Sequence, residues 1–294
     1  MIGKIIENIS NLYKVEANGE IYKATARGKF KNENQTPVVG DNVEIDITDK
    51  EKHIAVIEKI IPRKVYIKRP KLANITQIVF VLSSKHPKPD LLMLDKQLAF
   101  AEFLGIKSVI VLNKIDLDQK EEVKKIKAIY EKIGYPVIET TAKEKKGIDA
   151  LIKILKNNIN AFSGNSGVGK STLINGIFDR EITQEGEISK RNKRGKNTTT
   201  SIKLYEIEQN TYIADTPGFS TFDISEIEYN ELEKHFKEFR EHIKNCEFVG
   251  CTHIKEEKCG IKTAIQEGKI SQDRYDRFCK IYEELKQIKE RRKW

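Results

Sequence analysis

Short stretches of alternating apolar and polar side chains fill the first part of the chain. Residues 21–25 and 42–47 alternate in this way, and the turn-forming pairs Asn18-Gly19 and Gly40-Asp41 separate such stretches. Alternation is typical of strands with one buried face, and several short strands divided by turns favour a small β-barrel. We therefore predict a barrel over residues 1–68. We favour the five-stranded OB-fold, and an SH3-like barrel stays open.

The pattern changes near residue 69 to continuous apolar runs followed by helical segments. The predicted strands are residues 75–82, 109–112, 137–140, 159–162, 202–207 and 212–214. Such alternation is typical of a mostly parallel sheet covered on both faces, so residues 69–224 are expected to form an α/β domain. In its first helix Asp90 is the expected N-cap. The apolar stripe of that helix consists of Leu91, Leu94, Leu98 and Ala101.

Beyond residue 224 the pattern predicts helices and no further strand. Residues 226–243 have a helical pattern, and a cysteine cluster follows. A last helix carries Tyr275, Phe278, Tyr282 and Leu285 at helical spacing, which indicates core packing rather than a ligand site. We predict a third, helical domain over residues 225–294.

A glycine-rich loop follows the predicted strand 159–162 and precedes a helix that should begin near Ser171. In this context the Walker A pattern predicts phosphate binding, because glycines let backbone N–H groups face the phosphates. Lys170 is expected to contact the β and γ phosphates, and the Ser171 hydroxyl to coordinate Mg²⁺. The loop residues are Gly164, Asn165, Ser166, Gly167, Val168, Gly169, Lys170 and Ser171, with Thr172 next in the chain.

Two further strand ends carry groups that can select a guanine base. Asn113-Lys114-Ile115-Asp116 ends one strand, and the Asp116 carboxylate can accept two hydrogen bonds from guanine, whereas adenine offers no such donor pair. Asn113 would brace the loop, and the Lys114 stem would lie against the base. After the next strand, Thr141-Ala142-Lys143 can offer the Ala142 N–H to the guanine carbonyl.

Two segments have the features of nucleotide-sensing switches. Asp215-Thr216-Pro217-Gly218 follows a strand, with Asp215 expected near Mg²⁺ and the Gly218 N–H near the γ phosphate. Thr198-Thr199-Thr200 lies between the Walker A helix and Asp215. One of these threonines is expected to bind Mg²⁺ only when the γ phosphate is present. We assign Thr199 and leave its two neighbours open.

The order of these motifs is unusual. The guanine-selecting motifs at 113 and 141 precede the phosphate-binding loop at 164 and the switches at 198 and 215. The usual GTPase order is therefore circularly permuted, which a sheet tolerates if the old termini were close and the new ones lie in an exposed loop. The chain consequently runs from the second switch directly into the C-terminal segment.

Charge and composition point towards a polyanionic partner. Lys and Arg number 53 against 44 acidic residues, a formal charge of +9. Nucleic acid is the first partner to consider, although a Lys-rich proteome would give the same balance. No signal peptide and no apolar run of the roughly 18 residues that span a bilayer is found, so we expect a cytoplasmic protein without a membrane partner.

Two basic segments are candidates for nucleic-acid contacts. The first lies in the predicted first switch and contains Lys190, Arg191, Lys193, Arg194 and Lys196. If GTP orders this segment, its cations would bind a nucleic-acid phosphate backbone in that nucleotide state alone. The alternative is that the segment is a solvated connector without a partner. The second, on the barrel, combines one aromatic with cations: Arg27, Lys29, Phe30 and Lys31.

Three cysteines and one histidine form a compact metal-ligand pattern. Cys246, Cys251, His253 and Cys259 can hold Zn²⁺ tetrahedrally through three thiolates and one imidazole. Four filled positions imply a structural ion. Free thiols or a disulfide are the alternatives, although a reducing compartment disfavours the disulfide. We expect Cys279 to lie in the core and consider His242 a weaker substitute ligand.

A barrel, a permuted GTPase and a cysteine cluster in this order resemble the RsgA-type small-subunit biogenesis GTPases over essentially the whole chain. Arg27-Gly28-Lys29-Phe30 and residues 36–41 are similar to that family's barrel motif, and Arg274-Tyr275 with residues 282–285 to its terminal helix. The resemblance implies GTP hydrolysis to GDP, stimulation by the small ribosomal subunit, rRNA binding and a role late in subunit maturation.

One position departs from the family pattern. Family members usually carry His just before the Thr triplet, where this chain has Asn197, and Phe219 stands where many other GTPases have Gln. Both usual water-positioning groups are thus missing. Hydrolysis without the ribosome is expected to be slow, with Asn197 or a group from the partner completing the site.

The leading hypothesis is therefore a regulatory GTPase with Mg²⁺ and one Zn²⁺, monomeric and without a DNA partner. A second hypothesis is a passive RNA-binding assembly scaffold in which the nucleotide is structural. A third is a permuted GTPase that serves the large subunit or another RNA.

Overall fold

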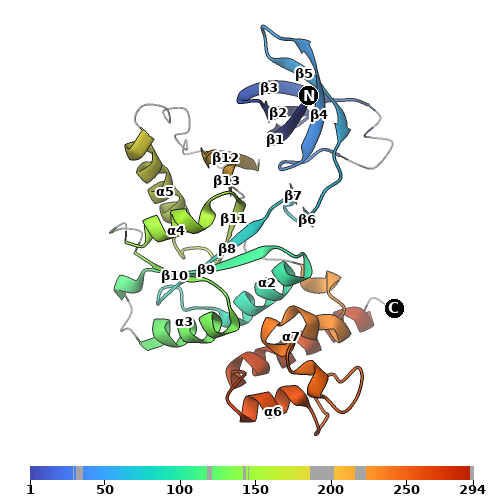
Figure 1. Cartoon of the computed structure of the whole chain (residues 1–294), viewed down its shortest axis with the longest axis vertical. Coiled ribbons are helices and arrows are strands. Elements are labelled where there is room, and N and C mark those ends of the chain that lie inside the picture. The colour runs from blue at the N-terminus through green and yellow to red at the C-terminus, as the bar shows by residue number, and fades with distance from the viewer. Residues whose placement is uncertain are drawn as a thin grey trace. The chain divides into compact units, whose positions relative to one another are not determined.

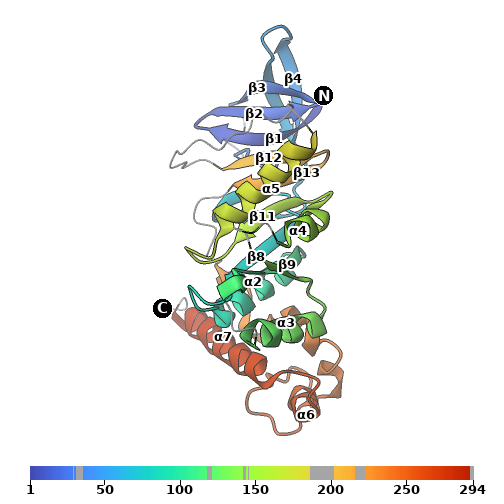
Figure 2. The same cartoon turned by 90° about the vertical axis from the view of Figure 1, so that its left-hand side faces the viewer.

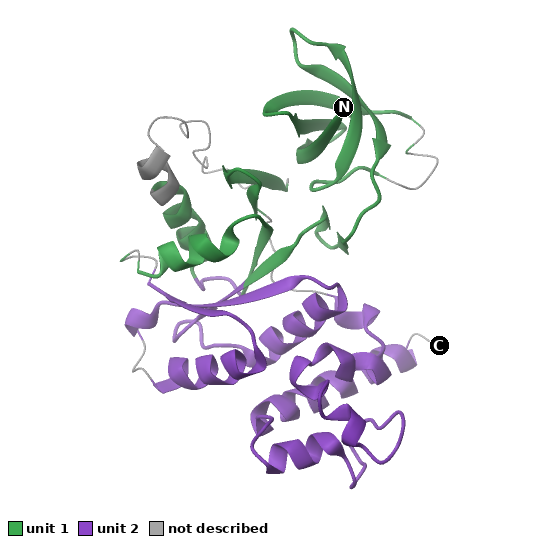
Figure 3. Cartoon of the chain, in the orientation of Figure 1, with its two compact units in different colours: residues 1–79, 142–164, 169–220 green, residues 80–141, 165–168, 221–294 purple. Residues whose placement is uncertain are grey.

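The computed structural model describes residues 1–28, 30, 36–117, 121–141, 144, 146–185, 202–215 and 223–291, with the backbone alone for residues 180–185 (Figure 1). The chain divides into two compact units, shown in Figure 3. Unit 1 contains residues 1–79, 142–164 and 169–220, and unit 2 contains residues 80–141, 165–168 and 221–294.

The first five strands, in unit 1, close into a barrel (blue in Figure 1). They are β1 (Ile2–Ile9), β2 (Leu12–Ala17), β3 (Glu20–Ala26), β4 (Asn42–Asp49) and β5 (Ile54–Ile60). They pair in the order β1-β2-β3-β5-β4, β4 also pairs with β1, and β3 runs parallel to β5. The alternating residues Val15, Ala24, Val43 and Ile57 fill the interior. The predicted OB-fold barrel is confirmed.

The Gly40-Asp41 corner of the barrel explains part of the motif noted in the sequence. Asp41 is fully buried, and its carboxylate accepts hydrogen bonds from the Val38 N–H (2.8 Å) and from Arg63 Nε (2.7 Å). Gly40 has φ 89°, and a Cβ there would lie 2.0 Å from the Ala73 carbonyl oxygen. Only glycine fits this corner. A short hairpin follows, formed by β6 (Tyr66–Lys68) and β7 (Lys71–Ala73).

Unit 1 also contains part of the α/β sheet. β11 (Ile159–Ser163) has two neighbours in this sheet, the start of β8 (Gln77–Ser83) and β13 (Thr211–Asp215). β11 and β13 run parallel to each other. β12 (Lys203–Glu208) is antiparallel to β13. The helices α4 (Ile148–Leu155) and α5 (Lys170–Glu185) lie side by side (Figure 1).

The barrel and this sheet are continuous, because β1 pairs with β12 through Glu7 and Lys203. Side chains support the junction. The Tyr212 hydroxyl donates to Glu16 Oε2 at 2.9 Å, and Lys4 Nζ lies 4.5 Å from the centre of the Tyr212 ring. The first strand of the barrel and the last two strands of the α/β sheet therefore belong to one packed body.

The remaining α/β strands lie in unit 2. β9 (Lys107–Asn113) pairs in parallel with β10 (Val137–Thr140), and β8 is its other neighbour. α2 (Leu91–Phe103), the short 3₁₀ turn η1 (Ile115–Leu117) and α3 (Glu121–Ile133) complete this part. All six predicted strands of the α/β sheet are present.

The predicted first helix of the α/β part also forms. The Asp90 carboxylate accepts a hydrogen bond from the Met93 N–H at 2.9 Å, so the expected N-cap is confirmed. Leu94, Leu98 and Ala101 are buried, while Leu91, the first residue of the stripe, is only partly buried.

The continuous helix predicted over residues 226–243 is wrong. Four 3₁₀ turns stand there instead: η4 (Ile224–Glu226), η5 (Tyr229–His235), η6 (Lys237–Phe239) and η7 (Ile243–Asn245). Leu232, Phe236 and Phe239 are completely buried in the core of this region, and Phe236 adopts an extended backbone between two turns. Burying these side chains outweighs the weak local preference for an α-helix.

The predicted last helix is confirmed, and a short helix that the sequence did not predict precedes it. α6 (Gly260–Gln266) precedes α7 (Gln272–Arg291), in which Phe278, Tyr282 and Leu285 are buried and Tyr275 is partly buried. Cys279 packs against the same core. Within the described residues, the chain after β13 contains no strand, and no helix anywhere is long and apolar enough to cross a membrane.

A cluster of buried charges joins α7 to α2, which lie side by side in Figures 1 and 2. Asp95 is fully buried and accepts hydrogen bonds from Arg274, from Arg277 Nε (2.5 Å) and from the Tyr130 hydroxyl (2.6 Å). Arg274 also donates to Glu238. The C-terminal helix is thereby fixed to the α/β part of unit 2 by paired charges as well as by apolar contacts.

Candidate functional site

The predicted phosphate-binding segment begins at the carboxyl ends of two parallel strands in unit 1. Ala161 of β11 is paired with Ala214 of β13, so the strands end side by side at Ser163 and Asp215. In α/β sheets, ligands bind at this edge. The predicted Mg²⁺ ligand Asp215 is partly buried there, and the glycine-rich loop leaves β11 at Gly164.

The loop leads directly into α5. Gly167 and Gly169 have φ values of 80° and 98°, a region that side-chain-bearing residues rarely adopt. Lys170 is the first residue of α5, and its ammonium donates to the Gly164 carbonyl at 2.5 Å. Partial burial lowers the pKa of Lys170, because the ammonium loses part of its hydration. An anionic ligand close to the ammonium would replace that lost stabilisation of the charged form.

The helix end is itself suited to anions, because the first N–H groups of α5 have no partner within the helix. The residues predicted to contact the phosphates differ in how exposed they are. Val168 is buried and Asn165 partly buried, whereas Ser166, Ser171 and Thr172 are exposed.

The predicted base-selecting residues are described within unit 2, where β9 and β10 end together. Asn113, paired with Thr140, is 1% exposed. Its side-chain amide donates to the Val168 carbonyl at 2.8 Å, and its Oδ1 accepts a hydrogen bond from Thr140 Oγ1 at 3.0 Å. The strand end thus holds the backbone of the glycine-rich loop. Thr141, next to Thr140, is also buried.

Lys114 makes a second connection within unit 2. It adopts a left-handed backbone (φ 61°), and its ammonium donates to the carbonyls of Gly167 (2.6 Å) and His86 (2.5 Å). The short turn η1 then presents Asp116 with an exposed carboxylate. In unit 2 the loop from Asn113 to Asp116 and the segment 165–168 therefore form one hydrogen-bonded group.

Several predicted residues lie outside the described residues. They are Ala142, Lys143, Asn197, Thr198, Thr199, Thr200, Gly218 and Phe219, together with the basic segment 190–196 and the barrel residues Lys29 and Lys31. Their assignments stay predictions.

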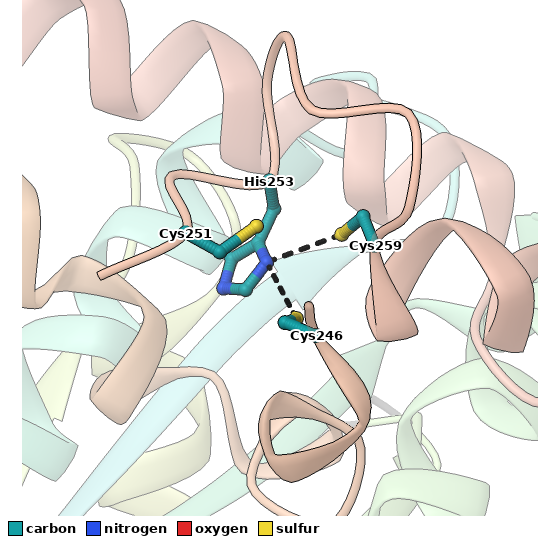
Figure 4. Close-up of side chains that lie close together, drawn as sticks. All are labelled: Cys246, Cys251, His253 and Cys259. Atoms are coloured by element: carbon teal, nitrogen blue, oxygen red, sulfur yellow. Dashed lines mark hydrogen bonds between the residues drawn. The ribbon is translucent and has the colours of Figure 1, made fainter. Parts of the chain in front are cut away.

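The predicted metal ligands come together in unit 2. The ligand atoms of Cys246, Cys251, His253 and Cys259 all lie within 4.8 Å of one another. Figure 4 shows the imidazole among the three sulfur atoms, with Nδ1 3.3 Å from Cys259 Sγ and 3.6 Å from Cys246 Sγ. All four cysteines are free thiols in the structure.

The chemistry of this donor set fits a zinc ion. Cys251, His253 and Cys259 are buried. Burial raises the pKa of Cys251 to about 12 and also raises the pKa of Cys259, because neighbouring thiolates are poorly solvated there. Three adjacent thiolates require a cation, and Zn²⁺ binds thiolate and imidazole in tetrahedral geometry.

The structure adds a residue that the sequence does not reveal. His253 Nε2, the ring nitrogen opposite the sulfur atoms, donates to the Glu233 carboxylate from η5. This contact places the proton on Nε2 and leaves Nδ1 free to bind metal. Glu233 lies 20 residues before His253. No spacing rule could have indicated it.

Known proteins resemble this chain over nearly its full length. A family model described as RsgA GTPase matches residues 60–225, and one described as RsgA N-terminal domain matches residues 2–55. A protein named small ribosomal subunit biogenesis GTPase RsgA, from Alkaliphilus metalliredigens, is 42% identical over 97% of this chain and 97% of its own length. The protein of that name from Ruminiclostridium cellulolyticum is 39% identical over 98% and 94%.

Two solved structures share the fold. YjeQ from Thermotoga maritima superposes with a TM-score of 0.83 at 35% identity, covering 97% of this chain and 98% of that one. YloQ, described as a circularly permuted GTPase, gives a TM-score of 0.82 at 30% identity, covering 98% and 95%.

Proposed function

Because the chain belongs to the RsgA family of GTPases, we propose that it hydrolyses GTP to GDP and phosphate as a switch in late maturation of the small ribosomal subunit. The observation that supports this most strongly is the hydrogen-bonded group in unit 2. Asn113 and Lys114, from the motif that would select guanine, bind the carbonyls of Val168 and Gly167 in the phosphate-binding loop.

We assign the nucleotide contacts by the position of each group. Asp116, Thr141 and Ala142 would select guanine. The phosphates would be bound by the loop N–H groups, Lys170 and Gly218. When Mg²⁺ is bound it neutralises phosphate charge, and Ser171, Thr199 and Asp215 would hold it. Asn197 is the candidate for orienting water.

We further propose small-subunit rRNA as the partner, a monomeric state and a cytoplasmic location. The formal charge of +9 and the barrel favour a nucleic-acid partner. The proposal also divides the chain by function into a barrel over residues 1–68, a GTPase part over residues 69–224 and a zinc-binding part over residues 225–294.

GTP hydrolysis should be slow for the protein alone and strongly stimulated by small ribosomal subunits. The reason is that neither His nor Gln stands at the usual water-positioning places. Phosphate release should be measured with small subunits, with large subunits and without ribosomes. Equal, slow turnover in all three would favour the scaffold hypothesis. Stimulation by large subunits alone would favour the third hypothesis.

Glu233→Gln should weaken zinc binding by about 10- to 100-fold, because the amide cannot orient and polarise the His253 imidazole as a carboxylate does. Zinc affinity is measured by competition with a chromophoric chelator. Glu231→Gln is the matched control, since Glu231 lies on the same turn but contacts Lys234. Equal zinc affinity of the two variants would show that Glu233 has no such role.

A further inference from the structure

The segment that follows β8 contacts the guanine-selecting loop, although it belongs to none of the motifs singled out in the sequence. Ser84 is 2% exposed. Its hydroxyl donates to the Lys114 carbonyl at 2.5 Å, and its N–H donates to the Asn113 carbonyl at 2.9 Å. One buried serine therefore binds two successive carbonyls of that loop.

These two carbonyls lie where the loop changes direction. Lys114 has the left-handed φ of 61°, and its carbonyl also accepts the Leu117 N–H at 2.9 Å, which closes the turn that carries Asp116. A left-handed conformation costs a non-glycine residue energy and persists only where contacts hold it. The bonds from Ser84 supply such contacts from outside the loop.

The end of β8 and the segment after it also contact the side chain of Lys114. Ser83 Oγ donates to the His86 carbonyl at 2.8 Å, and that carbonyl accepts the Lys114 ammonium at 2.5 Å. The ammonium also binds the Gly167 carbonyl. Residues 83–86, which we call the β8 loop, thus hold both the backbone and the side chain of Lys114.

We propose that the β8 loop is a positioning element for guanine recognition, with Ser84 as its central residue. It sets the backbone that directs the Asp116 carboxylate towards N1–H and the exocyclic amine of guanine. Ser84 does not touch the nucleotide in this scheme and acts through Asn113 and Lys114. The inference rests on the proposed function, because it assigns a role to Ser84 only if the chain binds guanine nucleotides.

Ser84→Ala should weaken GDP binding by about 3- to 15-fold, the effect expected for losing one buried hydrogen bond that holds the binding loop. The loss should be smaller for inosine diphosphate, which lacks the exocyclic amine, so the preference for GDP should fall. With small subunits, KM for GTP should rise while kcat stays unchanged, because the phosphate contacts are not altered.

The matched control is Ser108→Ala. Ser108 is a buried serine on β9 whose hydroxyl has no hydrogen-bond partner among the residues that the structure describes. This variant should bind GDP as the wild type does. Ser83→Ala, which removes only the hydrogen bond from Ser83 to the His86 carbonyl, provides a second measurement and should weaken GDP binding less than Ser84→Ala.

The test is a titration of a fluorescent GDP analogue and a competition with inosine diphosphate, using the zinc-loaded full chain of each variant. Thermal unfolding without nucleotide shows that each variant is folded. Unchanged GDP affinity in Ser84→Ala, or equal losses of affinity for GDP and inosine diphosphate in that variant, would overturn the inference. Failure of the wild type to bind GDP would instead overturn the proposed function, and the inference with it.

Discussion

Lys170→Ala is expected to lower hydrolysis stimulated by small subunits by about 10²- to 10³-fold, the usual effect of removing one group that stabilises transition-state charge. Lys170 begins α5 beside the glycine-rich loop, and its ammonium is held by the Gly164 carbonyl. Its loss removes the ammonium that binds the Gly164 carbonyl, and Lys170 is not among the buried core residues. Phosphate release at saturating GTP and small subunits gives the measurement.

The same variant distinguishes the hypothesis of a GTPase switch from that of a passive RNA-binding scaffold. A switch should lose nucleotide-dependent binding to small subunits, whereas a scaffold would keep binding its RNA target whatever the nucleotide. Lys153→Ala is the control, because Lys153 is an exposed lysine on α4 in the same unit. Hydrolysis by Lys170→Ala at the control's rate would contradict the assignment of Lys170.

Asp95→Ala should lower the free energy of unfolding by about 3–5 kcal/mol, the usual cost of removing one partner from a buried ion pair. Arg274 is 1% exposed and, among the described residues, would keep Glu238 as its charged partner, while Arg277 and the Tyr130 hydroxyl would lose the Asp95 acceptor. Urea unfolding followed by fluorescence or circular dichroism measures the change.

Glu283→Ala is the matched control for this variant, because Glu283 is an exposed acidic residue on α7. Its effect should stay within about 0.5 kcal/mol. A loss below 1 kcal/mol in Asp95→Ala would show that water or rearranged side chains replace the missing carboxylate, and that the charge cluster does not fix α7 to α2.

The α/β strands were predictable because each is a continuous apolar run, and the permuted motif order follows directly from residue numbers. The stretch 226–243 was not predictable in the same way. Its apolar residues repeat as in a helix, but Phe236 and Phe239 pack against Phe278, far along the chain, and this contact decides the backbone. Local periodicity carries no information about such partners.

The residues of the candidate site also differ in whether the sequence alone can reveal them. Motif residues such as Asn113 and Lys170 are recognisable because their chemistry requires fixed neighbours in sequence. Glu233 and Ser84 are not, since each acts on a residue at least 20 positions away and belongs to a common residue type. Contacts that orient a functional group from another element become visible only in the folded chain.

The pairing of β1 with β12 has a consequence for dividing this protein into pieces. At Lys203 the barrel supplies the neighbour of β12, so a fragment starting after residue 60 would leave part of β12 as a bare sheet edge. Unpaired edges invite pairing with other chains and aggregation. The isolated GTPase part is therefore expected to aggregate more readily than the full chain. A low yield of that fragment would give no information about the nucleotide site.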